Sequence, residues 1–150
     1  MKAVYDRIDL LLPKKARVLD IGGGVGILAE RLIESGRVVE VWDISPEAVK
    51  QAKASGIPAR VVDLEDACPE IPKDTWVVAT EVVEHLSEKA RRRLLQQIER
   101  AGGKGFLSVP NDRLGPEEEP QHTVKFNAVS FRKYLGDFRP RVEVLGPKAD

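Results

Sequence analysis

The sequence has little cysteine, no long hydrophobic run and no excess of either charge. Its single cysteine, Cys68, has no second cysteine to pair with, which excludes a small domain held together by internal disulfides. No uncharged apolar stretch approaches the roughly 20 residues that span a bilayer, so an integral membrane protein is excluded. The apolar stretch near the start is interrupted by charges and is not typical of a signal peptide. We therefore expect a cytoplasmic protein.

The charge balance also limits the classes of partner. Lys and Arg number 24 and Asp and Glu number 24, so the chain lacks the basic excess of domains that hold polyanions. Nucleic acid is therefore not indicated as a partner. Charged residues alternate with regular apolar positions, which predicts a folded chain, and its 150 residues suit a single domain over 1–150.

Short apolar runs alternate with segments of helical periodicity along the chain. This alternation predicts βαβ units and a doubly wound, mostly parallel sheet of the α/β class with about six strands. Ligands of such sheets bind outside the carboxyl ends of the strands, so the residues after each strand are the candidate site. The expected strands are 16–21, 37–43, 59–63, 75–80, 104–109 and 141–145, and the expected helices are 3–12, 26–35, 47–55, 88–101 and 127–135.

The most distinctive motif is the glycine loop DIGGGVG after the first expected strand. Gly22, Gly24 and Gly26 permit a tight turn and a close approach of a ligand to the backbone. The dinucleotide loop of an NAD(P)-dependent oxidoreductase is one alternative, because Gly24, Gly26 and Ala29 also match G-x-G-x-x-A. Asp20 argues against it, since a carboxylate at this position repels a pyrophosphate and suits the ammonium group of an amino acid.

This loop resembles motif I of the class I S-adenosylmethionine-dependent methyltransferases, and the similarity extends over most of the chain. The resemblance implies a Rossmann-like fold and S-adenosylmethionine as cofactor, with its methionine part held by the loop. Asp43 matches the acid that binds the ribose hydroxyls, and Asp63 with Leu64 matches the position that contacts adenine. The cofactor-binding residues implied in this way are Asp20, Gly22, Gly24, Gly26, Asp43, Ile44, Asp63, Leu64 and Glu81.

A second motif, TEVVEHL at 80–86, is similar to the E-V-x-E-H-L element of a methyltransferase subgroup. That subgroup includes ubiquinone-biosynthesis O-methyltransferases, and the resemblance implies methyl transfer to an oxygen or nitrogen of a small molecule. Glu84, His85 and His122 are then the candidate catalytic residues. An imidazole titrates near neutral pH, so either histidine can accept the proton of an oxygen nucleophile.

A metal-assisted reaction is the alternative for this second motif. In small-RNA 3′-terminal 2′-O-methyltransferases, a similar E-x-x-E-H turn and a distant histidine bind a divalent metal. Glu81, Glu84 and His85 would share one face of a helical turn, and His122 could join them. Such a ligand set favours manganese or a later transition metal over magnesium. The segment around His122 instead resembles the H-x-x-x-F of metal-free relatives, and the sequence leaves the metal undecided.

The chain departs from the resembled family in length. We find about six strands, one fewer than the seven-stranded sheet of full-length members, and the chain stops soon after Leu145. We therefore expect an open site, with room for a macromolecular acceptor, a partner subunit or a second copy of the chain. A cofactor-binding subunit of a heteromer without activity of its own is a further alternative. The motifs identify neither the acceptor nor its reacting atom.

Overall fold

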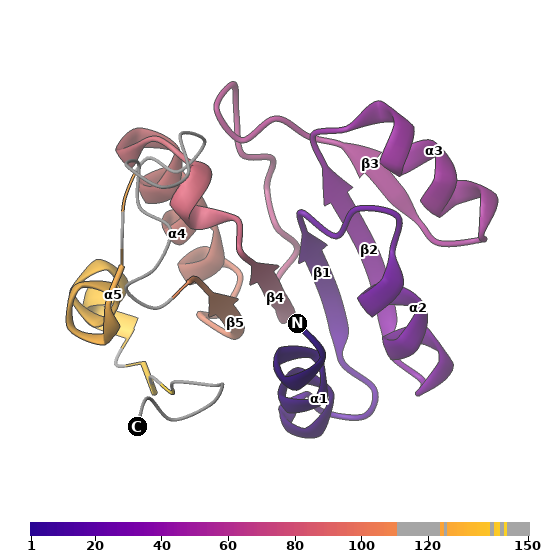
Figure 1. Cartoon of the computed structure of the whole chain (residues 1–150), viewed down its shortest axis with the longest axis horizontal. Helices are drawn as coiled ribbons and strands as arrows, with labels where there is room; N and C mark the ends of the chain where they lie inside the picture. The colour runs from indigo at the N-terminus through magenta and orange to yellow at the C-terminus, as the bar shows by residue number, and fades with distance from the viewer. Residues whose placement is uncertain (111–123, 125, 139, 142, 144–150) are drawn as a thin grey trace.

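A computed structural model describes residues 1–110, 124, 126–138, 140, 141 and 143 of the chain (Figure 1). Strands and helices alternate over this length, except that no helix lies between the third and fourth strands, as the sequence predicts. The helices are α1 (Lys2–Leu11), α2 (Ile27–Glu34), α3 (Pro46–Ala54), α4 (Glu88–Arg100) and α5 (Ala128–Leu135), with 3₁₀ turns η1 (Val83–His85) and η2 (Gly136–Phe138). The strands are β1 (Arg17–Ile21), β2 (Val38–Asp43), β3 (Ala59–Val61), β4 (Thr75–Thr80) and β5 (Gly105–Ser108).

The described strands form one parallel sheet in the order β3-β2-β1-β4-β5. The chain runs outward from β1 through β2 to β3 and then crosses to the other side of β1 for β4 and β5. The strand order therefore reverses between β1 and β4, where Asp20 is opposite Val78 and Ile21 is opposite Ala79. Doubly wound sheets bind ligands outside the carboxyl ends of the strands at such a reversal. The predicted doubly wound α/β fold is confirmed.

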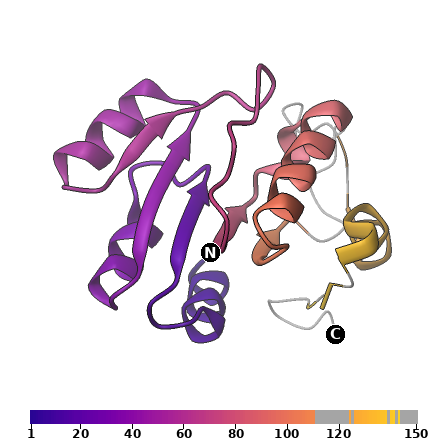
Figure 2. The ribbon, with the colours of Figure 1, turned by 180° about the vertical axis from the view of Figure 1, so that it is seen from behind.

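Side chains along each strand alternate between two apolar layers, one on each face of the sheet. Val18, Val39 and Val78 belong to the layer that includes side chains of α1, α2 and α3. Leu19 and Val77 belong to the other layer, which includes side chains of α4 and α5. Figure 1 and Figure 2 show these two groups of helices on opposite sides of the sheet. Burial on both faces explains why the strands appear in the sequence as short apolar runs.

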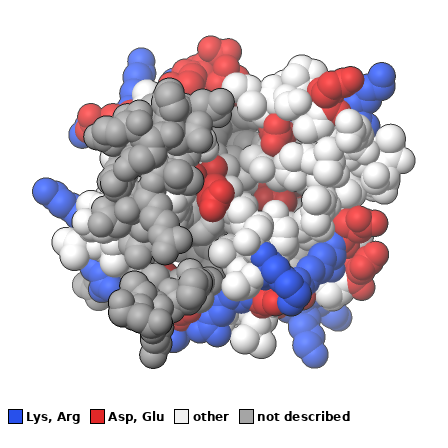
Figure 3. Space-filling view, in the orientation of Figure 1, with Lys and Arg blue, Asp and Glu red and all other residues white. Residues whose placement is uncertain are grey.

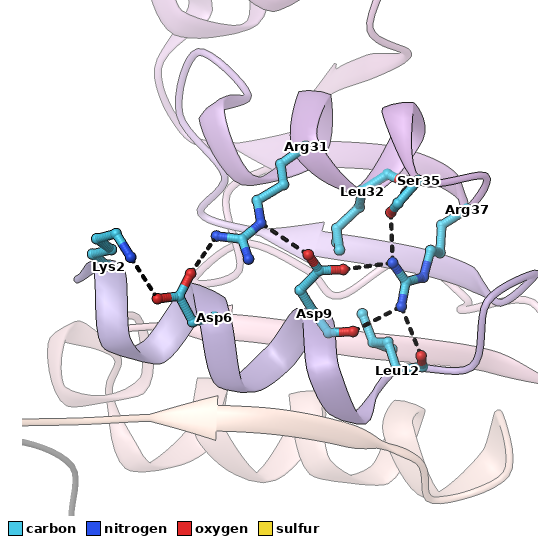
Figure 4. A network of polar contacts seen from close by, with 8 residues as sticks. All are labelled: Lys2, Asp6, Asp9, Leu12, Arg31, Leu32, Ser35 and Arg37. Atoms are coloured by element: carbon cyan, nitrogen blue, oxygen red, sulfur yellow. Dashed lines mark hydrogen bonds and ion pairs between the residues drawn. The ribbon is translucent and has the colours of Figure 1, made fainter.

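A polar network fastens α1 to its layer (Figure 4). The guanidinium of Arg37, which is only 6% exposed, donates to the backbone oxygens of Asp9 at 2.8 Å and Leu12 at 2.7 Å. Arg31 of α2 donates to the carboxylates of Asp6 at 2.7 Å and Asp9 at 2.9 Å. Because the terminal carbonyl groups of a helix have no partner within it, Arg37 stabilises the end of α1. The network thereby fixes α1 against the sheet.

The structure differs from the sequence prediction in some details. β3 ends two residues before the predicted boundary, because the backbone turns at Asp63, whose carbonyl oxygen accepts from the amide of Asp66 at 3.1 Å. Within α2, the apolar side chain of Ile27 is exposed, whereas Ala29 is buried. The predicted strand 141–145 lies largely outside the described residues and stays a prediction. Within the described part of the chain, no helix combines the length and hydropathy needed to cross a membrane.

Candidate functional site

The loop after β1 leaves the sheet through three left-handed glycines. The φ angles are +68° at Gly22, +58° at Gly24 and +92° at Gly26, a region that residues with a Cβ rarely adopt. Gly26 is also the N-cap of α2, so the loop leads directly into that helix. The predicted succession of strand, glycine loop and helix is confirmed, and it places the amide groups at the start of α2 near the end of β1.

Close packing inside the loop explains why its middle residue is also glycine. A Cβ at Gly23 would lie 2.6 Å from Oδ2 of Asp20 and 2.9 Å from a methyl group of Val41. A Cβ at Gly24 would instead have no atom of the described residues within 4 Å. The loop therefore closes over Asp20 on one side and leaves open space beside Gly24 on the other. A ligand could approach the backbone at Gly24.

Asp20 is a buried carboxylic acid at the end of β1. Its side chain is 1% exposed, and its Oδ2 has no hydrogen-bond partner among the residues that the structure describes. Burial raises the pKa of Asp20 to about 7, and the nearby charge of Asp43 raises it further in the same direction. Buried polar atoms in native proteins nearly always have a partner, so an exception with a perturbed pKa is typical of a ligand site. The group best suited to Oδ2 is a cationic donor.

Asp43 joins the ends of β1 and β2. Its Oδ2 accepts from the amide of Gly24 at 2.8 Å, and its Oδ1 accepts from the amide of Ser45 at 2.9 Å. Each carboxylate oxygen can accept a further hydrogen bond, so Asp43 keeps capacity for hydroxyl donors. The next residue, Ile44, is 64% exposed and provides an apolar side chain at the same edge of the sheet.

The loop after β3 is turned by Asp63, whose Oδ1 accepts from the amide of Glu65 at 2.9 Å. Leu64 is buried in the apolar layer on the α4 side, together with Val83 and Leu86. The side chain of Leu64 therefore packs into the core, and its expected contact with adenine stays a prediction. Ile44 is therefore the predicted site residue that offers an exposed apolar surface.

The segment after β4, residues 81–87, contains no glycine. Glu81 is exposed and has a φ of +55°, and its amide donates to the carbonyl oxygen of Ser108 at 2.8 Å. Glu84 is 1% exposed, and its Oε1 lies 3.8 Å from Nε2 of His85, whose side chain is 38% exposed. Of these three residues, Glu84 and His85 belong to the turn η1 and Glu81 precedes it, so the expected shared helical face is not formed.

The predicted fourth member of this group, His122, lies outside the described residues. Among the residues that the structure does describe, no group of three or more His, Cys, Asp or Glu side chains is placed to hold a metal ion. The structure thus brings Glu84 and His85 together beside the end of β1 and leaves the role of His122 as a prediction.

Tyr5 of α1 is a neighbour of this site that the sequence analysis missed. Burial raises the pKa of its phenol, and the negative charges of Asp20 and Glu81 add to the increase. The sequence predicts a helix at 3–12, but nothing in it indicates that this helix reaches the ends of β1 and β4.

The face shown in Figure 3 carries charges of both signs. Asp and Glu side chains lie near its middle among uncharged atoms, and a group of Lys and Arg side chains lies below them.

Comparisons with known proteins agree with this geometry. Residues 1–142 match a family model described as a methyltransferase domain. The trans-aconitate 2-methyltransferase of Mycolicibacterium gilvum is 34% identical over 97% of this chain and 57% of its own length. The ubiquinone biosynthesis O-methyltransferase of Xanthomonas oryzae pv. oryzae is 36% identical over 72% of this chain and 47% of its own length. The chain thus spans about half the length of these curated relatives.

Solved structures share the fold. A chain in the complex of the Haloferax volcanii Trm112 methyltransferase activator with a methyltransferase has a TM-score of 0.74 and 18% identity, covering 91% of this chain and 67% of that one. A TehB-like methyltransferase from Corynebacterium glutamicum has a TM-score of 0.69 and 22% identity, covering 91% and 71%. The magnesium protoporphyrin IX methyltransferase of Synechocystis, solved with S-adenosylmethionine bound, has a TM-score of 0.67 and 23% identity, covering 89% and 66%.

Proposed function

Because the chain belongs to the class I S-adenosylmethionine-dependent methyltransferase family, we propose that it binds S-adenosylmethionine at the carboxyl ends of β1, β2 and β3. In this proposal it transfers the methyl group to an oxygen or nitrogen of a small molecule. The observation that carries the proposal is the Oδ2 atom of Asp20, which is buried without a partner among the described residues. The amino group of a methionine moiety is a donor of the right charge for it.

The residues present fit this cofactor. Asp20 would accept from the amino group, and the open space beside Gly24 would let the ligand reach the loop backbone. Asp43 retains acceptor capacity for the two ribose hydroxyls, and Ile44 offers an apolar surface to the adenine ring. Asp63 and the backbone of the loop after β3 would recognise the amino group of that ring. When bound, the cofactor supplies a methyl group made electrophilic by its sulfonium.

The chain's own catalytic task is then to position and deprotonate the acceptor. His85 suits the deprotonation, because its partly exposed imidazole can act as a general base toward an acceptor bound beside it. The buried carboxylate of Glu84, whose Oε1 lies 3.8 Å from Nε2, would orient the ring. His122 is the second candidate base.

A small-molecule acceptor is supported by the names of the relatives, one acting on trans-aconitate and the other in ubiquinone biosynthesis. The chain also lacks the basic excess expected of a domain that holds a polyanion such as RNA. A partner subunit belongs to the proposal as well, since a chain of the same fold occurs in a complex with a methyltransferase activator.

Thermal unfolding with added ligands tests the proposal. S-adenosylhomocysteine at 100 times its Kd should stabilise the chain by about 2.7 kcal/mol, and NAD should leave the transition unchanged. Stabilisation by NAD alone would make the protein an oxidoreductase candidate and overturn the proposal.

A transfer assay with radiolabelled S-adenosylmethionine over metabolite, RNA and protein fractions then identifies the acceptor class. Label in the metabolite fraction is the expected result. Binding without label in any fraction would indicate a subunit without activity. Label in RNA that disappears with a chelator would favour the metal-assisted alternative, with His122→Ala as the variant that should lose the metal.

A further inference from the structure

We propose that Glu65 and Arg93 are positioning residues that couple the loop at 63–66, here called the adenine-side loop, to the turn at 83–87, here called the acceptor-side turn. The inference rests on the proposed function, because it assigns the first segment to the cofactor and the second to the acceptor. Neither residue belongs to the motifs found in the sequence, and both act between segments that are more than 15 residues apart.

Glu65 engages Ser87 with both of its carboxylate oxygens. Its Oε1 accepts from the backbone amide of Ser87 at 2.7 Å, and its Oε2 accepts from the hydroxyl at 2.7 Å. These two hydrogen bonds lower the pKa of Glu65, and the bond from the amide has the larger effect. The carboxylate is therefore charged at neutral pH. The two residues are 22 positions apart, so this contact depends on the tertiary fold.

The contact between Glu65 and Ser87 completes the N-terminal cap of α4. Ser87 is the N-cap of α4, and its hydroxyl oxygen accepts from the amide of Ala90 at 3.2 Å. In a capping box, a Glu or Gln three residues after the cap would return a hydrogen bond to the amide of the cap residue. Ala90 stands at that position and has no acceptor, and Glu65 supplies it from the adenine-side loop. The start of α4 is therefore completed by a residue of another segment.

Arg93 holds the same loop from the middle of α4. Its guanidinium donates to the carbonyl oxygens of Leu64 at 2.9 Å, Glu65 at 2.7 Å and Asp66 at 3.2 Å. The planar fork of an arginine binds neighbouring acceptors in a fixed geometry that a lysine cannot reproduce. Three successive carbonyl groups are thus fixed to the helix that follows the acceptor-side turn.

Together these contacts form a continuous path. Asp63 binds the amide of Glu65, Glu65 binds Ser87, and Ser87 lies two residues after His85. A ligand that orders Asp63 would therefore also restrict the acceptor-side turn. We infer that cofactor binding changes the surroundings of the His85 imidazole through this path.

Nuclear magnetic resonance of the imidazole groups tests the inference. The chain has two histidines, and comparison with His85→Gln identifies the His85 signal. In the wild type, saturation with S-adenosylhomocysteine should shift this signal. In Glu65→Ala the shift at saturation should fall to about half or less, and the affinity should fall about threefold. Glu65→Gln should restore part of the shift, because its amide oxygen can still accept one hydrogen bond.

Glu88→Ala is the matched control. It removes an exposed carboxylate near the start of α4 that pairs with Arg92 at 2.6 Å, and it should leave the shift unchanged. Arg93→Lys tests the same path by weakening the contacts of α4 with the adenine-side loop. It serves as the second variant if Glu65→Ala does not fold. If the His85 signal of folded Glu65→Ala or Arg93→Lys shifted as far as in the wild type, the inference would be overturned and the proposed function would remain. Failure of S-adenosylhomocysteine to bind the wild type would overturn the proposed function, and the inference with it.

Discussion

The ends of β1 and β4 are neighbours in the sheet, but the chain leaves them in different ways. After β1, three glycines with positive φ lead into α2 and enclose the buried Asp20. After β4, Glu81 adopts positive φ without the freedom of glycine, and the turn η1 follows with Glu84 buried. The β1 end takes its shape from local residue types, whereas the β4 end takes its shape from contacts with distant segments such as the adenine-side loop.

This difference matches the two tasks proposed for the site. The cofactor is common to a whole family, and a loop whose shape follows from its own residues serves that ligand. The acceptor differs between relatives, and a turn held by tertiary contacts can be adjusted by changes elsewhere in the chain. Variants at each end should therefore fail in different ways.

The largest expected effect is on the pH dependence of stability, through Asp20. Burial raises the pKa of Asp20 in the folded chain from its ordinary 3.8 to about 7, so the folded state binds more protons between these pH values. The stability that the protonated group contributes is complete below about pH 4 and is lost as the pH rises through 7. Relative to Asp20→Asn, the wild type without ligand should lose about 4 kcal/mol of unfolding free energy between pH 4 and pH 8.

Urea unfolding of both proteins across this pH range measures the difference. Titration of the other groups cancels in the comparison, since the two proteins differ only at Asp20. A difference that does not change with pH would mean that Asp20 is ionised normally and has a partner in the folded chain.

Substitutions at two neighbouring glycines separate the effect of packing on stability from the effect of ligand contact on affinity at the β1 end. Gly23→Ala should cost about 2 kcal/mol of stability, because the new methyl group would overlap Asp20 and Val41. Gly24→Ala should cost about 1 kcal/mol through its positive φ but should reduce the affinity for S-adenosylhomocysteine more strongly, since the methyl group enters the open space. Calorimetry and urea unfolding of both variants test this; unchanged affinity in Gly24→Ala would contradict a ligand at that position.

The smallest expected effect is at the β4 end. Glu81→Gly should change the unfolding free energy by less than about 1 kcal/mol, because relief of the left-handed strain is offset by the greater freedom of glycine in the unfolded chain. Glu81→Val should destabilise by about 1–2 kcal/mol, since a β-branched residue is disfavoured at positive φ. Destabilisation by Glu81→Gly as large as that by Glu81→Val would show that side-chain contacts of Glu81 outweigh the backbone strain.

The same contrast explains what could be predicted from the sequence. The order of strands and helices, the glycine loop and the position of Asp43 at the end of β2 follow from local patterns, and the structure confirms them. The side-chain burial of Leu64, the nearness of Tyr5 and the capping of Ser87 by Glu65 depend on which segments meet in space. The spacing of residues along the chain does not reveal such tertiary contacts, so these features could be identified only from the fold.

The central claim is that the carboxylate of Asp20 binds a cationic amino group. Titration calorimetry of S-adenosylhomocysteine binding to the wild type and to Asp20→Asn, at several pH values from 5 to 8, tests it most directly. We predict that affinity for the wild type falls as the pH drops below about 7, because Asp20 must then lose its proton to bind. In Asp20→Asn, binding should be at least about tenfold weaker at pH 8 and free of this pH dependence. Equal affinities with the same pH dependence in both proteins would contradict the claim.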